Sequence, residues 1–274
     1  MGVLNVTPDS FSDGGRFVTL GAAIEQAESM QAEGAAIIDV GGESTRPGAS
    51  PVSEREELDR VIPVIEVLSQ RLHIPVSVDT SKPAVMKAAV AAGAGMINDV
   101  RALTEPGAID AAIASDVPVC LMHMQGEPRT MQLGPSYRRV VNDVVRFLTK
   151  RVECLMDAGF PQNRMILDPG FGFGKTLEHN LELLADLESI ADLGFPVMVG
   201  LSRKSMIGRL LRDRPVGERV FGSVAATVLA VERGARLVRV HDVLATCDAL
   251  KVCRAVMEAD RPPEDFSQEK ATSE

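Results

Sequence analysis

The glycine-rich stretch "LDPGFGFGKT" (167–176) is the first segment whose residue types suggest chemistry, because Gly-Lys-Thr is typical of phosphate-binding loops. Such a loop needs a further glycine five positions before Gly174, and that position is Pro169, which has no backbone N–H. The dinucleotide pattern G-x-G-x-x-G begins at Gly170 and fails at Lys175. The segment is therefore not expected to bind a nucleotide. Its informative residue is Asp168, where a short apolar run ends.

Two chemically distinct groups of polar residues accompany other segments of the chain. Asp79, Asn98 and Asp168 offer anionic acceptors and an amide, which suit a flat ligand with several N–H donors and a carbonyl. A second group offers donors and positive charge, which suit a diphosphate. Its members are Asn5, Arg46, Arg239 and His241. Lys204 is expected to contact both groups, and Ser205 is expected near a helix start, where backbone N–H groups favour a small carboxylate.

Most of these polar residues stand at or near the ends of eight apolar, often β-branched runs. The runs cover residues 3–6, 36–40, 76–79, 96–99, 119–122, 165–168, 197–200 and 237–240. Stretches with helical periodicity lie between the runs, as at 22–35, 53–72, 139–159 and 222–235. Several of these stretches end in a glycine, where a left-handed helix cap is expected. The glycines are Gly34, Gly93, Gly159, Gly194 and Gly234.

Eight strand–helix repeats predict a (β/α)8 TIM barrel and favour it over a doubly wound open sheet. The nearly continuous apolar strands are typical of a sheet that is buried on both faces. A barrel carries its active site at the C-terminal ends of its strands. The polar residues expected there are Asn5, 39–43, Asp79, 98–99, 122–123, Asp168, 202–205 and 239–241. Within this set, Asp99 and Glu43 are expected to bond loop ends or cap helices.

The segments around the barrel complete the predicted organisation. Two long loops, 7–17 and 42–53, are rich in Gly, Pro and Ser and leave the first two strands at the active face. We expect them to close over a substrate as lids. Residues 1–259 are predicted to form a single barrel domain, and the polar tail 260–274 is expected to be disordered.

The composition excludes several classes of partner. The chain has 274 residues with a net charge of −9 and 4% aromatic residues, so nucleic acid is not an expected ligand. No apolar run approaches the ~20 residues of a membrane span, and Met1 leads into "GVLNVTPDSF" without a basic, then apolar leader. Four cysteines lack zinc-site or C-x-x-C spacing and are expected to be buried, reduced thiols of a cytoplasmic protein. They are Cys120, Cys154, Cys247 and Cys253.

Eight motifs occur in order along the chain. They are "MGVLNVTPDSFSDGG", "IIDVGGESTRPGA", "VSVDTSKP", "INDVRAL", "LMHMQGEP", "LDPGFGFGKT", "VGLSRKSMIG" and "RVHDV". From residue 1 to about 257 the chain thereby resembles the dihydropteroate synthase family, the bacterial folate-pathway enzymes that sulfonamides inhibit. The family usually has a short segment before the first strand, whereas Met1 lies almost at that strand here, which puts the stability of the strand in question.

The resemblance implies a transferase that joins the methylene of 6-hydroxymethyl-7,8-dihydropterin diphosphate to the amine of p-aminobenzoate and releases diphosphate. It also implies Mg²⁺ as cofactor and a homodimer. Carried over by motif, the pterin would be held by Asp79, Asn98, Asp168 and Lys204, with Met122 on its face. The p-aminobenzoate site would be shaped by Pro47, Phe173, Lys204 and Ser205. The anion site would comprise Arg239, Val240 and His241, with Thr45 and Arg46 from the second lid and Asn5 helping to hold Mg²⁺. The glycines around Phe173 would serve a sharp turn past Asp168.

The implied reaction is a substitution at the pterin methylene in which diphosphate departs ahead of attack by a neutral arylamine. Catalysis would be mostly positioning and electrostatics. The residues expected to supply it are Lys204, Asp79, Asp168, Arg46, Arg239 and His241. Three alternatives remain: a pterin-binding methyltransferase module, which should lack "STRPG" and "SRKS", a Schiff-base aldolase using Lys204, and a non-catalytic relative.

Overall fold

The computed structural model describes residues 1–7, 16–44, 48 and 51–259, and there it contains one sheet of eight parallel strands in chain order. The strands are β1 (Gly2–Asn5), β2 (Ile38–Gly41), β3 (Val76–Asp79), β4 (Met96–Asp99), β5 (Val119–Met122), β6 (Met165–Asp168), β7 (Val197–Val199) and β8 (Ala235–Val238). A parallel bridge between Gly2 and Val240 returns the last strand to the first, where the N–H of Val3 donates to the carbonyl of Val240 at 3.0 Å. The predicted barrel is therefore confirmed.

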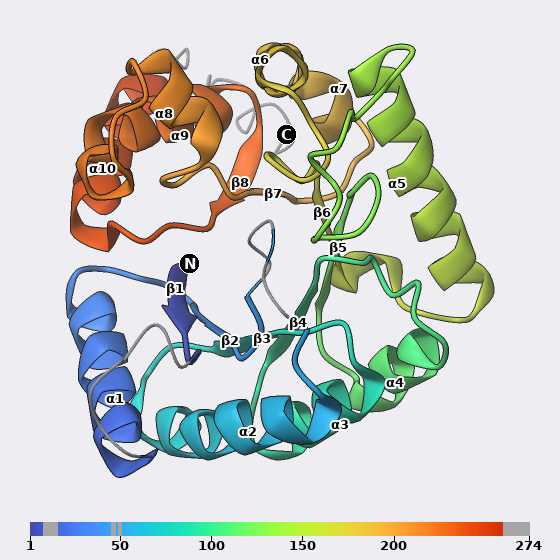
Figure 1. The fold of residues 1–274 in the computed structure, drawn as a ribbon, viewed down its shortest axis with the longest axis vertical. Helices are drawn as coiled ribbons and strands as arrows, with labels where there is room; N and C mark the ends of the chain where they lie inside the picture. The colour runs from blue at the N-terminus through green and yellow to red at the C-terminus, as the bar shows by residue number, and fades with distance from the viewer. Residues whose placement is uncertain (8–15, 45–47, 49–50, 260–274) are drawn as a thin grey trace, which may run out of the picture.

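The helices surround the strands on the outside (Figure 1). They are α1 (Arg16–Ala32), α2 (Glu54–Arg71), α3 (Pro83–Ala91), α4 (Ala108–Ser115), α5 (Val140–Asp157), α6 (Leu177–Ala185), α7 (Glu188–Ala191), α8 (Ser205–Leu210), α9 (Val220–Glu232) and α10 (Val243–Ala259). Two short 3-10 helices, Gln162–Arg164 and Val216–Glu218, precede β6 and α9. None of the described helices is both long enough and apolar enough to cross a membrane.

Glycine ends the helices as the sequence predicts. All five predicted cap glycines have a positive φ, between 81° at Gly194 and 107° at Gly93. Glycine adopts this left-handed conformation without the steric penalty of a side chain, which lets the chain leave each helix and turn toward the next strand. The start of α2 is fixed by a capping box, in which Ser53 and Glu56 each accept the backbone N–H of the other.

Strand alternation divides the barrel interior into two layers, because side chains two residues apart point to the same face. The lower layer is apolar and is formed by Met96, Cys120, Ile166 and Met198. Three of these positions stand two residues before Asn98, Met122 and Asp168 in the same strands. The upper layer, at the C-terminal ends of the strands, therefore contains the predicted site residues.

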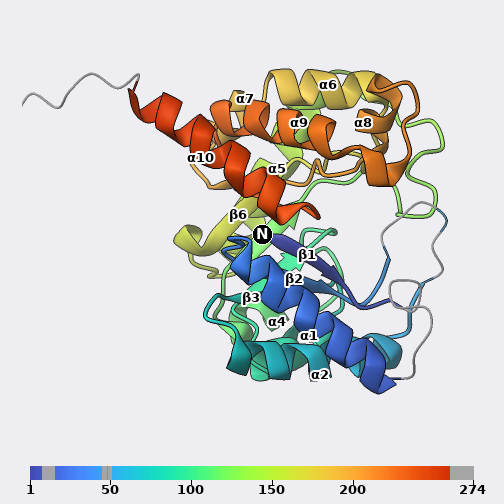
Figure 2. The ribbon, with the colours of Figure 1, turned by 90° about the vertical axis from the view of Figure 1, so that its left-hand side faces the viewer.

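The N-terminal strand is held on both of its edges. The terminal ammonium of Met1 donates to the carbonyl of Val238 at 2.9 Å, and the carbonyl of Met1 accepts the N–H of Val240 at 2.9 Å. The N-terminus lies between α1 and α10 (Figure 2), and a Cβ on Gly2 would come within 2.7 Å of Met30 Sδ. β1 is therefore paired and packed.

Two predictions about local structure are corrected. Strand bounds shift by up to two residues: β8 covers Ala235–Val238 instead of 237–240, since Ala235 already pairs with Val197 of β7, next to a register irregularity between Val197 and Met198. All four cysteines are free, as expected, but Cys154 is exposed and Cys247 is half-buried. The prediction of buried thiols is wrong for these two residues, because their side chains are not on the packed faces of the outer helices α5 and α10, whereas Cys253 of α10 is buried.

Candidate active site

Asp168 ends β6 in register with Met122, the last residue of β5. The Asp168 carboxyl is buried, and its Oδ1 accepts the N–H of Gly170 at 2.7 Å. Burial raises the pKa of Asp168 to about 6, against the opposing effects of that N–H and of nearby Lys204 and Lys175. At neutral pH the carboxyl is therefore ionised, without a hydrogen-bonded cation among the described side chains. It is a strong acceptor for the N–H groups of a ligand.

Asp79, the last residue of β3, is in register with Asn98, the last but one residue of β4, and Asp39 and Arg239 join them. Arg239 Nε donates to Asp39 Oδ2 at 2.6 Å, and Arg239 Nη2 donates to Asp79 Oδ2 at 2.8 Å. Asn98 Nδ2 donates to the same Asp39 oxygen at 3.0 Å. The four side chains form one network across the end of the barrel. Arg239, which the sequence assigned to the anion site alone, thus also supports the predicted pterin carboxylates.

Burial and mutual charge set the protonation of this network. Burial raises the pKa of Asp79 to about 7, although Arg239 acts to lower it. Burial disfavours the guanidinium of Arg239, but Asp39 and Asp79 raise its pKa overall. Arg239 is therefore charged, whereas Asp79 is near the midpoint of its titration at neutral pH and can accept or donate. Asp39 Oδ1 is buried and has no hydrogen-bond partner in the described structure.

Lys204 and Phe173 face each other beside this network. Lys204 Nζ lies 4.1 Å from the centroid of the Phe173 ring, within the range of a cation–π contact. Lys204 is the residue before α8, which begins at Ser205 as the sequence predicts. Burial and the charge of Arg239 lower the pKa of Lys204 to about 8, against the effect of Asp168. A largely charged ammonium therefore separates an aromatic wall from the carboxyl cluster.

His241 offers a donor rather than a charge. Its backbone N–H and its Nδ1 lie 3.2 and 3.1 Å from Ser202 Oγ. Burial, followed by the charge of Arg239, lowers the pKa of His241 to about 4, so the expected positive charge is corrected to a neutral imidazole. Arg203 is bound to Asp242 through Nε at 3.0 Å and Nη2 at 2.5 Å.

The glycines around Phe173 serve a tight turn. Gly170, Gly172 and Gly174 have φ values of 70°, 78° and 61°. A Cβ on Gly170 would lie 1.9 Å from the carbonyl oxygen of His123, and one on Gly174 would lie 2.3 Å from that of Gln125. Only glycine satisfies both the backbone angles and this close approach to the loop after β5. The turn thus presses the Phe173 segment against the end of the neighbouring strand.

Comparison with known proteins agrees with this geometry. A sequence model of a family described as "pterin binding enzyme" matches residues 1–241. The dihydropteroate synthase of Haemophilus influenzae is 53% identical over 259 residues, which cover 94% of each chain. The chain belongs to the dihydropteroate synthase family. A structure of the Yersinia pestis dihydropteroate synthase with a sulfonamide drug complex matches with a TM-score of 0.90 at 52% identity, over 94% of each chain. The Xanthomonas albilineans dihydropteroate synthase with 4-aminobenzoic acid matches with a TM-score of 0.90 at 54% identity, over 96% of this chain and 93% of that one.

Most residues that the dihydropteroate synthase motifs single out lie at one end of the barrel. They are Asn5, Asp79, Asn98, Met122, Asp168, Phe173, Lys204, Ser205, Arg239, Val240 and His241. Thr45, Arg46 and Pro47, and much of the two predicted lids, lie outside the described residues. Asn5 Oδ1 is 3.7 Å from the position that a Cβ on Gly41 would occupy, so the Asn5 amide lies beside the end of β2. The described residues contain no cluster of three or more His, Cys, Asp or Glu that could hold a metal ion.

The sequence places Asp39 among the polar residues of the active face without a specific role and gives Lys175 no role in the site, whereas both have several partners in the structure. Asp39 binds Arg239 and Asn98 at once, and the available signal was a charge inside an apolar run, since a buried charge requires partners. Lys175 was considered only as a phosphate ligand. It is buried and its Nζ contacts backbone carbonyls and the ring of His123. Partners of this kind leave no signal in the sequence.

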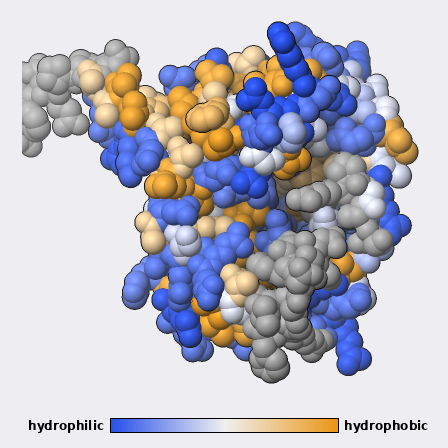
Figure 3. All heavy atoms as spheres, turned by 60° about the vertical axis from the view of Figure 1, so that its left-hand side comes forward, coloured by the Kyte–Doolittle hydropathy of each residue, from blue (hydrophilic) through white to orange (hydrophobic). Residues whose placement is uncertain are grey.

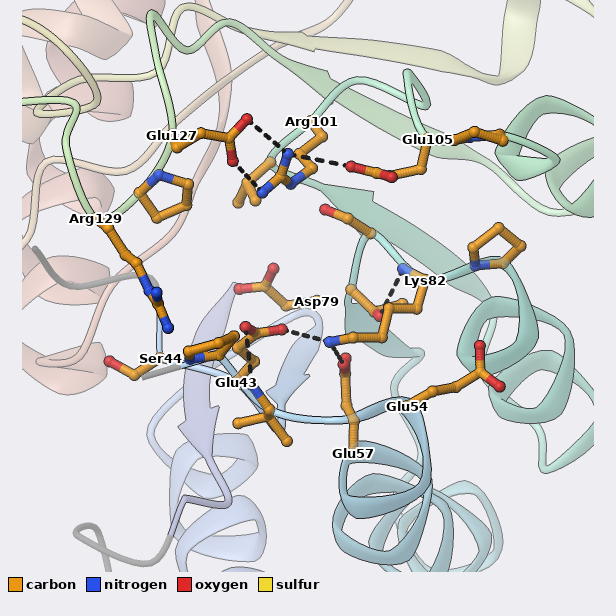
Figure 4. Close-up of a pocket in the computed structure, with 18 residues that line it drawn as sticks. Glu43, Ser44, Glu54, Glu57, Asp79, Lys82, Arg101, Glu105, Glu127 and Arg129 are labelled. Carbon is orange, nitrogen blue, oxygen red and sulfur yellow. Dashed lines mark hydrogen bonds and ion pairs between the residues drawn. The ribbon is translucent and has the colours of Figure 1, made fainter. Parts of the chain in front are cut away.

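A cavity of about 510 Å³ opens beside the carboxyl network of this synthase-family barrel (Figure 4). Among the predicted site residues that the structure describes, only Asp79 lines it. Lys82 Nζ points between Glu43, at 2.5 Å, and Glu57. Figure 4 also shows Arg101 between two carboxylates of the opposite wall. The cavity is a charged vestibule, and most of the predicted pterin cradle lies outside it.

The loop roles expected for Glu43 and Asp99 are confirmed. Glu43 accepts the N–H of Val52 at 3.3 Å in addition to its contact with Lys82. Asp99 accepts the backbone N–H groups that follow β4, including that of Leu103 at 2.7 Å. Both carboxyls therefore fix loops around the site.

Proposed function

We infer that the protein is a dihydropteroate synthase. It condenses 6-hydroxymethyl-7,8-dihydropterin diphosphate with p-aminobenzoate to give 7,8-dihydropteroate and diphosphate. The observation that carries this inference is the convergence of Asp79, Asn98 and Asp168 beside the Lys204–Phe173 pair, in a chain about half identical to known dihydropteroate synthases. The Xanthomonas relative with 4-aminobenzoic acid supports the identity of the second substrate.

A coupled diphosphate-release assay tests this function. The purified protein should release diphosphate from the pterin diphosphate only when p-aminobenzoate is present, and dihydropteroate should form in equal amount. Lys204→Ala should abolish the release. Diphosphate release that is independent of any arylamine, or no release at all, would refute the assignment.

The buried carboxyls are proposed to recognise the pterin. Asp168 offers an ionised acceptor and Asp79 an equilibrium between acceptor and donor, which suits the ring N–H groups of a pterin. Asn98 contributes an amide whose orientation Asp39 holds. As the diphosphate departs, positive charge is delocalised from the methylene into the ring, and the Asp168 carboxylate stabilises that charge.

Lys204 and Phe173 are proposed to align the arylamine. The Phe173 ring supplies a wall for the aromatic acid, and the N-terminal end at Ser205 supplies polar groups for its carboxylate, with Pro47 from outside the described residues. An aromatic amine is neutral at pH 7, so its lone pair attacks without a strong general base. Lys204 opposes the developing positive charge, so its role is hydrogen bonding and alignment.

The leaving diphosphate is proposed to be held by donors near the last strand. Arg239 retains its charge, and neutral His241 supplies an N–H. Thr45 and Arg46 are assigned to the same site by the family motif only. Val240 places these groups, because its backbone pairs with β1 and turns the chain there.

Mg²⁺ is proposed as the cofactor. Asn5 supplies one amide oxygen at the end of β1, and protein sites often hold Mg²⁺ through one or two ligands plus substrate phosphates and water. The donor set fits that mode, because the diphosphate itself would complete the coordination. When bound, the ion neutralises charge on the leaving group.

A Schiff-base aldolase is the alternative that one observation favours, because burial lowers the pKa of Lys204 to about 8 and so increases its free-amine fraction. Borohydride trapping with carbonyl substrates separates the two functions. A covalent adduct on Lys204 would support the aldolase. The methyltransferase module is disfavoured by the presence of "STRPG" and "SRKS".

We further propose that residues 1–259 act as one domain and that two copies associate through α9 and α10. Phe221 on α9 is 82% exposed, and Val252 and Val256, one turn apart on α10, are 66% and 65% exposed. Figure 3 shows hydrophobic side chains gathered on this side of the molecule. Sedimentation velocity of Phe221→Asp should show a monomer, whereas Leu133→Asp, equally exposed elsewhere, should remain dimeric.

The free cysteines support a reducing compartment such as the cytoplasm.

A further inference from the structure

Lys175 is a buried lysine whose ammonium contacts four acceptors and, in the described structure, no carboxylate. Its Nζ lies 2.9 Å from His123 Nδ1, 2.9 Å from the carbonyl of Gly170 and 3.1 Å from that of Phe173. The carbonyl of His123 is 3.4 Å away. A lysine is almost never fully buried unless its ammonium has partners, because burial of an unpaired ammonium destabilises the folded state.

These contacts join three parts of the site. His123 follows Met122 at the end of β5, Gly170 and Phe173 belong to the turn after β6, and Lys175 itself leads into α6. Met122 and Asp168 are fixed by the paired strands. Phe173 has no such support, since it belongs to the turn between β6 and α6. The Lys175 ammonium is therefore the central tie between that turn and the strand beside it.

Three other side chains add weaker, neutral ties to the same turn. The Tyr137 hydroxyl donates to the carbonyl of Gly174 at 2.7 Å, Asn180 accepts the N–H of Gly172 at 2.7 Å, and Gln132 Nε2 donates to the carbonyl of Gly172 at 2.7 Å. A hydrogen bond from a charged donor is roughly twice as strong as one from a neutral donor, so loss of Lys175 should release the turn more than loss of any one of these three.

We propose that Lys175 is a positioning residue for the second substrate: its ammonium holds the 170–174 turn so that Phe173 forms the wall against which the arylamine binds. This role rests on the proposed function. Lys175 touches neither substrate, and it acts through Phe173 and through the contact of Phe173 with Lys204. The strand-borne pterin residues do not depend on it.

Protonation gives this role a signature in pH. Burial lowers the pKa of Lys175 to about 7, with Asp168 raising it and Lys204 lowering it. The titratable groups that face it are His123 after β5, Asp168 on β6, Lys204 before α8 and Tyr137 in the β5–α5 loop. Burial and the charge of Lys175 lower the pKa of His123 to about 3, so this ring is neutral and accepts. Above the pKa of Lys175 the neutral amine has only two N–H donors for four acceptors, and the hold on the turn weakens.

Three measurements on Lys175→Met, with Lys87→Met as a control on the exposed face of α3, test the proposal. Calorimetry with Mg²⁺-diphosphate present should show the dissociation constant of p-aminobenzoate rising about tenfold or more, while that of a pterin analogue changes less than about threefold. Amide hydrogen exchange in the 170–174 turn of the free protein should accelerate. Between pH 6 and 8.5 the p-aminobenzoate affinity of the parent protein should fall toward that of the variant. The quantity to follow is the ratio of the p-aminobenzoate affinities of the parent protein and of Lys175→Met, because Asp168 and Lys204 titrate in both proteins.

Unchanged exchange in the turn, unchanged p-aminobenzoate affinity, or an equal loss of both ligands would each overturn the proposal. The equal loss would mean a general structural role. If Lys175→Met does not fold, Tyr137→Phe should weaken p-aminobenzoate binding in the same direction and by less, and a lack of any effect would again overturn it. A parent protein that binds neither ligand would refute the proposed function instead, and the exchange measurement would still decide whether Lys175 fixes the turn.

Discussion

At the scale of single residues, Asp168 favours ligand binding at the expense of stability. Its pKa rises from 3.8 to about 6 on folding, mainly because of burial. The folded state then binds the proton of Asp168 more tightly than the unfolded state does. Protonation of Asp168 therefore stabilises the folded protein fully below pH 3.8, and this contribution to the free energy of unfolding is lost as pH rises through about 6. At pH 7.5 an ionised, buried carboxylate remains, and it is available for the N–H groups of a ligand.

Asp168→Asn should therefore separate binding from stability. We expect the dissociation constant of a pterin analogue to rise tenfold or more, at a cost of about 1–3 kcal/mol. The free energy of unfolding at pH 7.5 should increase by about 1–3 kcal/mol, and this gain should vanish toward pH 4. Denaturant unfolding and calorimetry measure the two effects, with the exposed Asp157→Asn as control. A variant less stable than its parent at pH 7.5 would contradict the argument.

We expect Asp39 to affect catalysis through its neighbours. Its charge raises the pKa of Asp79, and it binds Arg239 Nε at 2.6 Å. Asp39→Asn should raise the activation free energy by about 1.5–3 kcal/mol, because Arg239 loses its ion pair with the Asp39 carboxylate. The pKa of Asp79 should also fall below 7, so the acid limb of the pH–activity profile should move to lower pH. A profile that keeps its shape while activity falls would show that Asp39 does not set the protonation of Asp79.

At the scale of elements, the turn after β6 and the end of α7 provide a matched pair of glycines. Both Gly170 and Gly194 have a positive φ, but a Cβ would meet the His123 carbonyl at 1.9 Å in the first and nothing within 4 Å in the second. Gly194→Ala should cost about 1 kcal/mol of stability through backbone strain alone and leave both substrates bound. Gly170→Ala should also displace the Phe173 turn and weaken p-aminobenzoate binding. Thermal unfolding and calorimetry compare them, and equal effects on binding would contradict the contact argument.

Features that depend on local sequence could be predicted for this molecule, whereas contacts between distant segments could not. Strands and helix-ending glycines follow from local hydrophobicity and backbone freedom, and all eight strands and all five glycine caps were predicted. The partners of Arg239 and Lys175 depend on contacts between distant segments, since Asp39 and Arg239 stand 200 residues apart and the Lys175 acceptors are mostly backbone carbonyls. The residue types of the site were therefore predictable from the family motifs, whereas the network that orients them was not.

At the scale of the whole molecule, closure of the barrel assembles the site. β8 returns to β1 through Gly2 and Val240, and this return brings Arg239 across to Asp39 on β2 and Asp79 on β3. The predicted diphosphate groups and pterin groups thus share one guanidinium. A ligand at one end of the site therefore changes the electrostatics of the other end.

We expect the two substrate sites to be coupled through this arrangement and through Arg46, which lies outside the described residues. Mg²⁺-diphosphate should tighten p-aminobenzoate by roughly 5–150-fold, the usual range of 1–3 kcal/mol for coupling between sites. By linkage, p-aminobenzoate must tighten diphosphate by the same factor. Calorimetry of p-aminobenzoate with and without Mg²⁺-diphosphate measures the coupling directly. Arg46→Ala should remove most of it and leave the affinity of a diphosphate-free pterin nearly unchanged, whereas Arg55→Ala, on the exposed side of α2, should leave it intact. Equal p-aminobenzoate affinities in both titrations of the parent protein would mean that the arylamine site is complete without the anion.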